Sequence, residues 1–105
     1  MNEIDEIVDE IELFIEERKW NKYHTPKNIA ISISIEASEL LEKFQWSELS
    51  FQDIIKNKEK KDEIADELAD VLIYSLIFLK KAKLDFKEII KKKIEKNRKK
   101  YPIIQ

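Results

Sequence analysis

Hydrophobic residues recur at helical spacing along much of the chain, and this pattern predicts amphipathic helices at both ends. The first helix begins near Asn2, a good N-cap, with Asp5 placed for a capping-box-like start. Its apolar stripe comprises Ile4, Ile7, Val8, Ile11, Phe14 and Ile15. The last helix begins at Asp85, with Glu88 three residues on, and stops at Pro102. One face of that helix carries Phe86, Ile89, Ile90, Ile94, Asn97 and Tyr101.

The segment from residue 25 to 44 gives a mixed signal. Thr25 followed by Pro26 is a strong helix start. Residues 29–35 alternate and are β-branched, which indicates a strand, yet they continue without a turn residue into the helix-favouring stretch 36–44. A strand here would have no partner strand elsewhere in the chain. We therefore expect one helix, buried on most sides.

The remaining pattern completes an all-α fold. Residues 47–61 are expected to form a connection, with room for a short helical piece over 51–55, and a further helix covers 61–81. The core stripe of that helix comprises Ile64, Leu68, Val71, Leu72, Ser75, Leu76 and Leu79. We predict a single domain over 1–105, a small four-helix arrangement. Its two central helices carry more apolar surface than one small chain can bury, which favours a homo-oligomer.

Composition narrows the classes of function. The chain has 105 residues, 43% hydrophobic and 40% charged, and its longest nearly unbroken apolar run, 71–79, is far short of the ~20 residues of a membrane span. No export leader is apparent, and the absence of cysteine excludes disulfides and cysteine nucleophiles and fits a cytoplasmic location. Glycine is also absent, so a phosphate would have to be bound by side chains or a metal ion.

Charge is divided unevenly along the chain. Residues 1–79 carry 9 Lys/Arg against 19 Asp/Glu, whereas residues 80–105 carry 11 against 3. The basic end is typical of a solvated lysine face near a helix C-terminus, and a non-catalytic module that binds nucleotides or nucleic acid is an alternative. The overall charge of −2 and the apolar residues interleaved in the last helix argue against a dedicated nucleic-acid binder.

Four carboxylates stand in the most apolar parts of the chain. Glu36 and Glu39 are three residues apart and so share a helix face, and Glu67 and Asp70 repeat that spacing. If the two helices are antiparallel, the pairs meet, and their mutual repulsion would be relieved by a hard cation such as Mg²⁺. The alternative is an ordinary solvated acidic face. A ferritin-like di-iron site is excluded because His24 is the only histidine.

At these residues the chain resembles the all-α, MazG-like nucleotide pyrophosphohydrolases. Glu36–Glu39 and Glu67–Asp70 are similar to the ExxE and ExxD halves of that family's signature. Four segments also resemble motifs of its dCTP pyrophosphatase branch: WNKYHTPKN at 20–28, ELLEKFQW at 39–46, ELADVLIY at 67–74 and KIEKNRKKYP at 93–102. The similarity covers residues 7–102, in order.

The resemblance implies a Mg²⁺-dependent enzyme of nucleotide-pool control. It would cleave a nucleoside triphosphate, dCTP or a related pyrimidine nucleotide, between the α- and β-phosphates to a monophosphate and pyrophosphate. The metal ligands implied are Glu36, Glu39, Glu67 and Asp70, of which the first two also serve catalysis. The substrate-binding residues implied are Trp20, His24, Asn28, Trp46, Tyr74, Lys93, Asn97 and Arg98.

Two further expectations concern assembly and base preference. Proteins of this branch assemble as dimers or tetramers, which agrees with the excess of apolar surface. Vertebrate members carry a histidine where this chain has Ile11. The preference for cytosine is therefore open. Trp46 and Tyr74 follow the acidic pairs by 7 and 4 residues, so helical spacing predicts that both rings border the metal groove.

Overall fold

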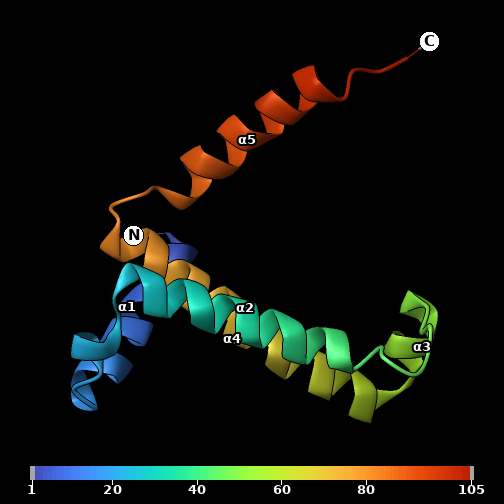
Figure 1. Ribbon diagram of the computed structural model, residues 1–105, viewed down its shortest axis with the longest axis horizontal. Coiled ribbons are helices and arrows are strands. Elements are labelled where there is room, and N and C mark those ends of the chain that lie inside the picture. The colour runs from blue at the N-terminus through green and yellow to red at the C-terminus, as the bar shows by residue number, and fades with distance from the viewer. Residues whose placement is uncertain (1, 105) are drawn as a thin grey trace.

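The computed structural model describes residues 2–104, which are almost entirely helical (Figure 1). The elements are α1 (Glu3–Glu17), the 3-10 helix η1 (Asn21–Tyr23), α2 (Pro26–Glu42), α3 (Phe51–Lys56), α4 (Lys58–Lys81) and α5 (Phe86–Lys100). The all-α prediction is confirmed, and residues 29–35 are helical. The short piece expected within the connection exists as α3, so the described chain has five α-helices and not four.

The centre of the fold is an antiparallel pair, α2 beside α4, with α1 packed across α4 (Figure 1). Three buried isoleucines, one from each of these helices, form the core: Ile15, Ile29 and Ile77. A further buried residue, Ile64, lies nearer the start of α4. This small core fixes how α2 and α4 face each other, and therefore where their carboxylates meet.

Side-chain caps set the helix starts. Asn2 and Asp85 each accept a hydrogen bond from the backbone N–H three residues on, at 2.9 Å in both cases, as the sequence predicts. Ser50 and Asp53 form a complete capping box at α3. The predicted start of α4 at residue 61 is wrong, because the Asn57 side chain accepts from the Lys60 N–H at 3.1 Å and caps the helix earlier.

Two predictions about the central helices need correction. The expected helix over 25–44 ends at Glu42, where i→i−3 hydrogen bonds tighten the backbone into turns over 43–46. The prediction that this helix is buried on most sides is wrong, because only α4 covers it closely and Ile31 and Ile35 are 46% and 51% exposed. Leu68 and Leu72 of the predicted α4 stripe are also exposed, while Ile77 takes a core place.

Helix α5 stands apart from the rest of the molecule. It leaves the end of α4 and extends away from the α2–α4 pair with only marginal contact to other elements (Figure 1). The radius of gyration is 16.7 Å, against about 13 Å for a compact domain of this length. Large apolar side chains on α5, including Ile90 and Ile94, are nearly half exposed. Within residues 2–104, no helix is long and apolar enough to cross a membrane.

Two helices end in a left-handed residue that is not glycine. Lys19 and Lys83, which follow α1 and α4, both have φ of 57°. Beyond each, a backbone N–H returns to a carbonyl five residues earlier, from Trp20 to Ile15 at 3.1 Å and from Leu84 to Leu79 at 2.9 Å. This is the bonding of a Schellman motif, in which the left-handed position usually falls to glycine. In a chain without glycine, lysine takes it.

Candidate functional site

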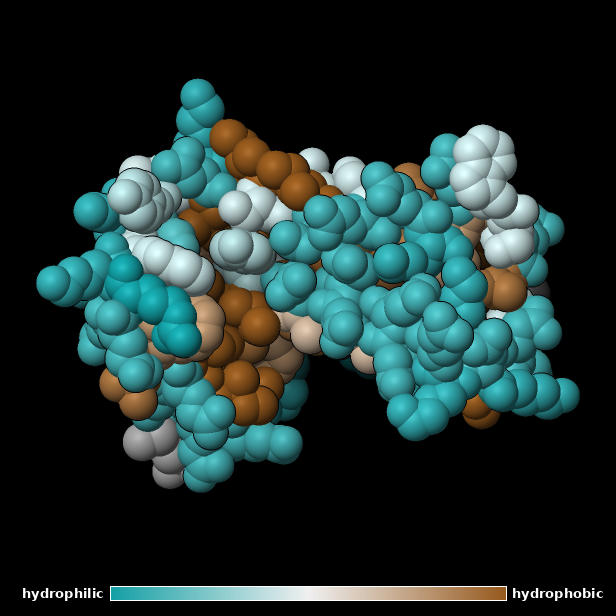
Figure 2. All heavy atoms as spheres, turned by 90° about the horizontal axis from the view of Figure 1, so that it is seen from below, coloured by the Kyte–Doolittle hydropathy of each residue, from teal (hydrophilic) through white to brown (hydrophobic). Residues whose placement is uncertain are grey.

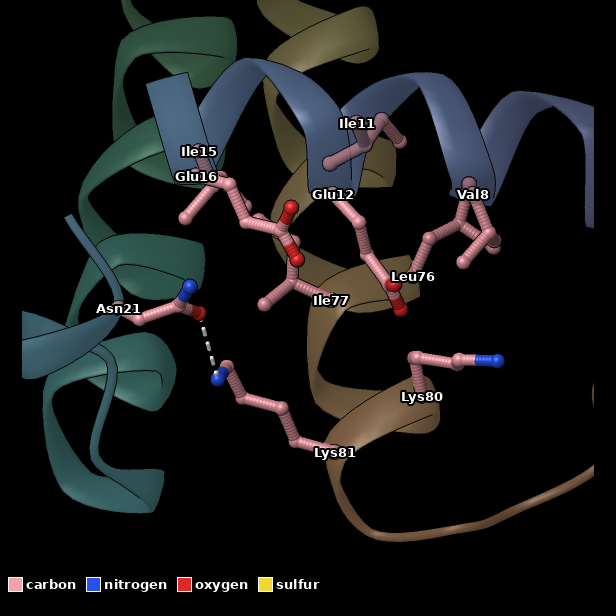
Figure 3. A pocket seen from close by; sticks show the side chains of 10 residues that line it. All are labelled: Val8, Ile11, Glu12, Ile15, Glu16, Asn21, Leu76, Ile77, Lys80 and Lys81. Atoms are coloured by element: carbon pink, nitrogen blue, oxygen red, sulfur yellow. Dashed lines mark hydrogen bonds between the residues drawn. The ribbon is translucent and has the colours of Figure 1, made fainter. Parts of the chain in front are cut away.

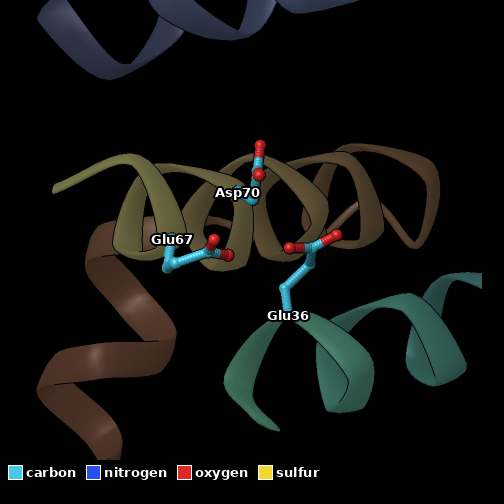
Figure 4. Close-up of side chains that lie close together, drawn as sticks. All are labelled: Glu36, Glu67 and Asp70. Carbon is cyan, nitrogen blue, oxygen red and sulfur yellow. The ribbon is translucent and has the colours of Figure 1, made fainter. Parts of the chain in front are cut away.

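Three of the four predicted carboxylates form an acidic triad. One oxygen from each of Glu36, Glu67 and Asp70 lies within 4.8 Å of the others (Figure 4). Glu36 comes from α2 and the other two from α4. Glu67 and Asp70 share a face because they are three residues apart, and the antiparallel packing brings Glu36 opposite them. The predicted meeting of the two acidic pairs is therefore present in the fold.

The triad is electrostatically unsatisfied. The Oε2 atoms of Glu36 and Glu67 are buried and have no hydrogen-bond partner among the described residues. Burial, followed by the neighbouring Glu39, Asp70 and Glu67 carboxylates, raises the pKa of Glu36 from 4.5 to about 7. Burial and then Glu39 raise the pKa of Glu67 as well, against the lowering effect of Lys43. Packing thus holds the carboxylates together although their charges repel.

Glu39 borders the triad without belonging to it. Its charge acts on both Glu36 and Glu67, so its carboxylate lies beside the other two, but it is not among the three residues whose oxygens converge within 4.8 Å. Glu39 is half-buried, as are the triad residues. The fourth predicted ligand is therefore in place at the edge of the site.

The donor set suits a hard divalent cation. Carboxylate oxygens are the ligands that Mg²⁺ and similar ions prefer, and Mg²⁺ commonly binds one or two of them together with substrate phosphates. A cation between Glu36 and Glu67 would give their buried oxygens the partner that they lack. Histidine and cysteine are missing from the triad, which disfavours a zinc-type site.

A largely apolar cavity of about 520 Å³ opens beside the triad, and Asp70 is part of its wall. Aromatic groups dominate one side. The Phe14 and Trp20 rings meet edge-to-face with centroids 5.6 Å apart, and the His24 and Tyr74 rings do so at 6.5 Å. A cavity of this size suits a small organic ligand, and aromatic walls can stack on a nucleobase.

Four of the predicted substrate-binding residues gather here. Trp20, His24 and Tyr74 line both this cavity and an adjoining one, where Asn28 joins them. The Asn28 amide donates to the carbonyl of Tyr23 at 2.9 Å, which ties η1 to the start of α2. Burial, and then the Lys81 ammonium, lower the pKa of His24, whose buried Nδ1 has no partner among the described residues. A neutral imidazole therefore faces the cavity at pH 7.

The other four predicted substrate-binding residues lie elsewhere. Trp46 is 88% exposed and lies beyond the end of α2, so the continuous helix on which its predicted place beside the groove rests is wrong after Glu42. Lys93, Asn97 and Arg98 are on the detached helix α5, and Arg98 pairs with Glu95. Their substrate-binding roles stay predictions.

A separate cavity of about 280 Å³ lies between α1 and the end of α4 (Figure 3). Its rim carries Glu12 and Glu16 from α1 and Lys80 and Lys81 from α4, over an apolar floor. Lys81 donates to the Asn21 side chain at 3.1 Å and so fixes η1 to α4. No residue of the acidic triad lines this cavity, so it is separate from the site.

Sequence reasoning missed the part that α1 plays in the site. Ile7, Glu10, Ile11 and Phe14 line the cavity beside Asp70. Their spacing of 3, 4 and 7 places them on one helix face, which is a signal that the sequence contains. A stripe of this kind is ordinarily buried against a neighbour, and here part of it is exposed beside the acidic triad. Figure 2 shows apolar side chains gathered around the hollowed surface at the end of the molecule where α1 lies.

Comparison with known proteins agrees with the motifs. The MazG-like family model matches residues 31–105. The chain is similar to dCTP pyrophosphatase 1 of Rattus norvegicus, with 31% identity over 91 residues that make up 86% of this chain and 54% of that protein. With the protein of the same name from Homo sapiens it shares 32% identity over 92 residues, 85% and 53% of the two chains. The chain thus spans about half the length of these curated relatives.

A solved structure extends the similarity to the whole fold. The crystal structure of a pyrophosphatase from Archaeoglobus fulgidus DSM 4304 superposes with a TM-score of 0.87 at 45% identity. The match covers 98% of this chain and 95% of that one, so it includes α5 as well as the central helices.

Proposed function

Because the chain belongs to the MazG-like family, we propose that it is a Mg²⁺-dependent nucleoside triphosphate pyrophosphohydrolase. The substrate is a nucleoside triphosphate, with dCTP or a related pyrimidine nucleotide as the first candidate. Hydrolysis between the α- and β-phosphates yields the monophosphate and pyrophosphate. The names of the relatives, dCTP pyrophosphatase 1 and pyrophosphatase, support this reaction.

The observation that carries the proposal is the pair of buried, unpartnered oxygens on Glu36 and Glu67 beside Asp70. When bound there, Mg²⁺ would offset the carboxylate charge and hold phosphate oxygens for attack by water. Glu36 and Glu39 are the two carboxylates that we assign to catalysis, one of which accepts the proton of the attacking water. The aromatic cavity beside Asp70 takes the base.

The direct test is product analysis. Incubation with dCTP and Mg²⁺ should release dCMP and pyrophosphate in equal amounts, and phosphorus NMR distinguishes this from release of single phosphates. Removal of the metal with a chelator should stop the reaction, and added Mg²⁺ should restore it. Nucleotide binding without pyrophosphate release, across the common and modified nucleoside triphosphates, would favour the non-catalytic binding module instead.

We further propose a homo-oligomer in which α5 of one subunit completes the site of another. The described part of the chain buries only four apolar side chains, and it leaves Ile90 and Ile94 of α5 exposed with no covering element. Lys93 and Asn97 lie on the same helix, which has only marginal contact with the α2–α4 pair in its own chain. A neighbouring subunit that covers the apolar face of α5 would bring these side chains to its own phosphate site.

Subunit mixing tests the shared site. Inactive Asp70→Asn and inactive Lys93→Ala chains, unfolded together and refolded, should regain part of the activity, because some sites would combine an intact triad with an intact α5. A mixture of Asp70→Asn and Glu67→Gln chains is the matched control and should stay inactive, since both changes damage the same triad. If neither mixture regains activity, each subunit holds a complete site.

A further inference from the structure

Glu10 stands at an unexpected place in the wall of the cavity beside Asp70. It lies on α1 between Ile7 and Phe14, at spacings of three and four residues, and next to Ile11. This face of α1 is otherwise apolar where it lines the cavity. A carboxylate in such a wall loses hydration when a ligand fills the space, which is costly unless the ligand supplies a hydrogen bond.

Glu10 differs from the other polar residues that line the cavity. Asp70 belongs to the acidic triad, and His24 and Tyr74 occupy the side formed by η1 and α4. Among residues 2–104, the Glu10 carboxylate has neither an ion-pair partner nor a hydrogen bond that would hold it. It is thus the one free acceptor that α1 contributes to the cavity wall.

We propose that Glu10 is a specificity-determining residue that accepts a hydrogen bond from the exocyclic amine of a 4-aminopyrimidine base. The inference rests on the proposed function, which places the base in this cavity and the phosphates at the triad. An ionised carboxylate only accepts hydrogen bonds. Cytosine presents an N–H donor at carbon 4, whereas uracil and thymine present a carbonyl acceptor there. Glu10 therefore favours the first and repels the second.

The neighbouring Ile11 increases the importance of Glu10 for base recognition. Its aliphatic side chain offers no hydrogen bond, so on α1 the discrimination depends on the residue one position earlier. Glu10 is exposed in this structure, so a ligand that fills the cavity would cover it. A ligand that leaves the covered carboxylate without a hydrogen bond is rejected more strongly than one that merely lacks a contact. Hydrogen bonds to charged groups are strong enough to give a preference for cytosine over uracil of roughly tenfold to a hundredfold.

The test compares Glu10→Leu and Glu10→Gln with the wild type, using kcat/KM for dCTP and dUTP and equilibrium binding of dCMP and dUMP. Glu6→Gln is the matched control, because Glu6 is an exposed acid of the same helix that lines none of the cavities described above. The wild type and Glu6→Gln should prefer cytosine. Glu10→Leu should lower the preference by about tenfold or more. Glu10→Gln should shift it towards uracil, because an amide can also donate to a carbonyl.

The outcomes separate this inference from the proposed function. If the wild type hydrolyses neither triphosphate but binds dCMP more tightly than dUMP in a Glu10-dependent manner, the proposed reaction is wrong and the base recognition stands. If it hydrolyses triphosphates and the cytosine-to-uracil ratio is the same in Glu10→Leu, the reaction stands and the role of Glu10 is overturned. A wild type without base preference, or without binding of either monophosphate, also overturns it.

Discussion

The α2–α4 pair and helix α5 differ in how much of their apolar surface is packed against other elements of the chain. The pair packs around Ile29 and Ile77 and brings acidic groups from two helices together. Helix α5 is equally regular and well capped, yet Ile90 and Ile94 of its apolar face are nearly half exposed among the described residues. The pair is stabilised by packing between its own helices, whereas α5 has only marginal contact with the other described elements. The difference teaches that the acidic groups of the proposed site meet within one chain, whereas Lys93 and Asn97 would need the proposed oligomer to reach a triad.

Loss of one triad carboxylate should have the largest effect. Asp70→Asn, or Glu39→Gln at the edge of the triad, should reduce turnover by at least about a hundredfold to a thousandfold. The first change weakens the proposed hold on Mg²⁺ and so the charge stabilisation at the reacting phosphates, and the second removes one of the two carboxylates assigned to the proton transfer from water. The helical circular dichroism spectrum should not change, and relief of repulsion should raise the melting temperature without metal. Asp66→Asn, an exposed acid of the same helix, is the control. Activity equal to the wild type at saturating Mg²⁺ would refute the four-carboxylate site.

Charge on the apolar face of α5 should break the assembly. We expect the wild type to sediment as a dimer or larger species of its 12.6 kDa chain. Ile90→Glu combined with Ile94→Glu should shift the protein to the single-chain mass, because a charged face of α5 would no longer pack against another subunit. Most activity should be lost with the oligomer. Lys99→Glu, also on α5, controls for the change in charge. A wild type that sediments as one chain at micromolar concentration would contradict the shared site.

Truncation of Trp46 should have an intermediate effect. Loss of one stacking ring costs ~1–3 kcal/mol, so Trp46→Ala should weaken nucleoside triphosphate binding by roughly tenfold to a hundredfold. Inorganic triphosphate, which has no base, should bind nearly as before. Phe51→Ala, another exposed aromatic residue, is the control and should change neither. Because Trp46 is 88% exposed and lies beyond the end of α2, a selective effect would also support delivery of this ring by a partner.

The smallest expected effect is a change in the thermal stability of the metal-free protein with pH. The pKa of Glu36 is raised from 4.5 to about 7, so between these values the folded chain binds more protons than the unfolded chain. The free energy of unfolding of the metal-free protein should therefore fall as pH rises through this window. Below the window, Glu36 should contribute little to its pH dependence. Thermal denaturation in a chelator should give a lower melting temperature at pH 7.5 than at pH 5. In Glu36→Gln this difference should shrink, and if it persists undiminished, another group is responsible.

Helix type and most helix starts, that of α4 excepted, were predictable because they depend on local chemistry. Caps at Asn2, Thr25 and Asp85 act on backbone groups three residues away, and the structure has all three. The meeting of Glu36 with Glu67 and Asp70 was also predictable, since two antiparallel helices and a shared periodicity suffice. These features require no knowledge of the surface around them.

The features that could not be predicted from the sequence depend on tertiary contacts. Periodicity assigned Leu68 and Leu72 to the core, but a stripe wider than one neighbour can cover does not reveal which of its residues that neighbour will bury. Helical spacing could not place Trp46, because the expected helix stops at Glu42, with neither glycine nor proline to signal it. The part of Glu10 in the cavity wall follows from how α1 crosses α4, which is a property of packing and not of pattern.

The left-handed residue Lys83 affects the entropy of the proposed assembly. Left-handed backbone costs a non-glycine residue about 1–2 kcal/mol, but a lysine there has fewer unfolded conformations to lose than a glycine would. The turn that directs α5 away from α4 is thereby stiffer than the usual glycine turn. In the proposed oligomer, a helix held in one direction before it meets a partner would lose less freedom on association, and part of the entropic cost of assembly would be met during folding of the single chain.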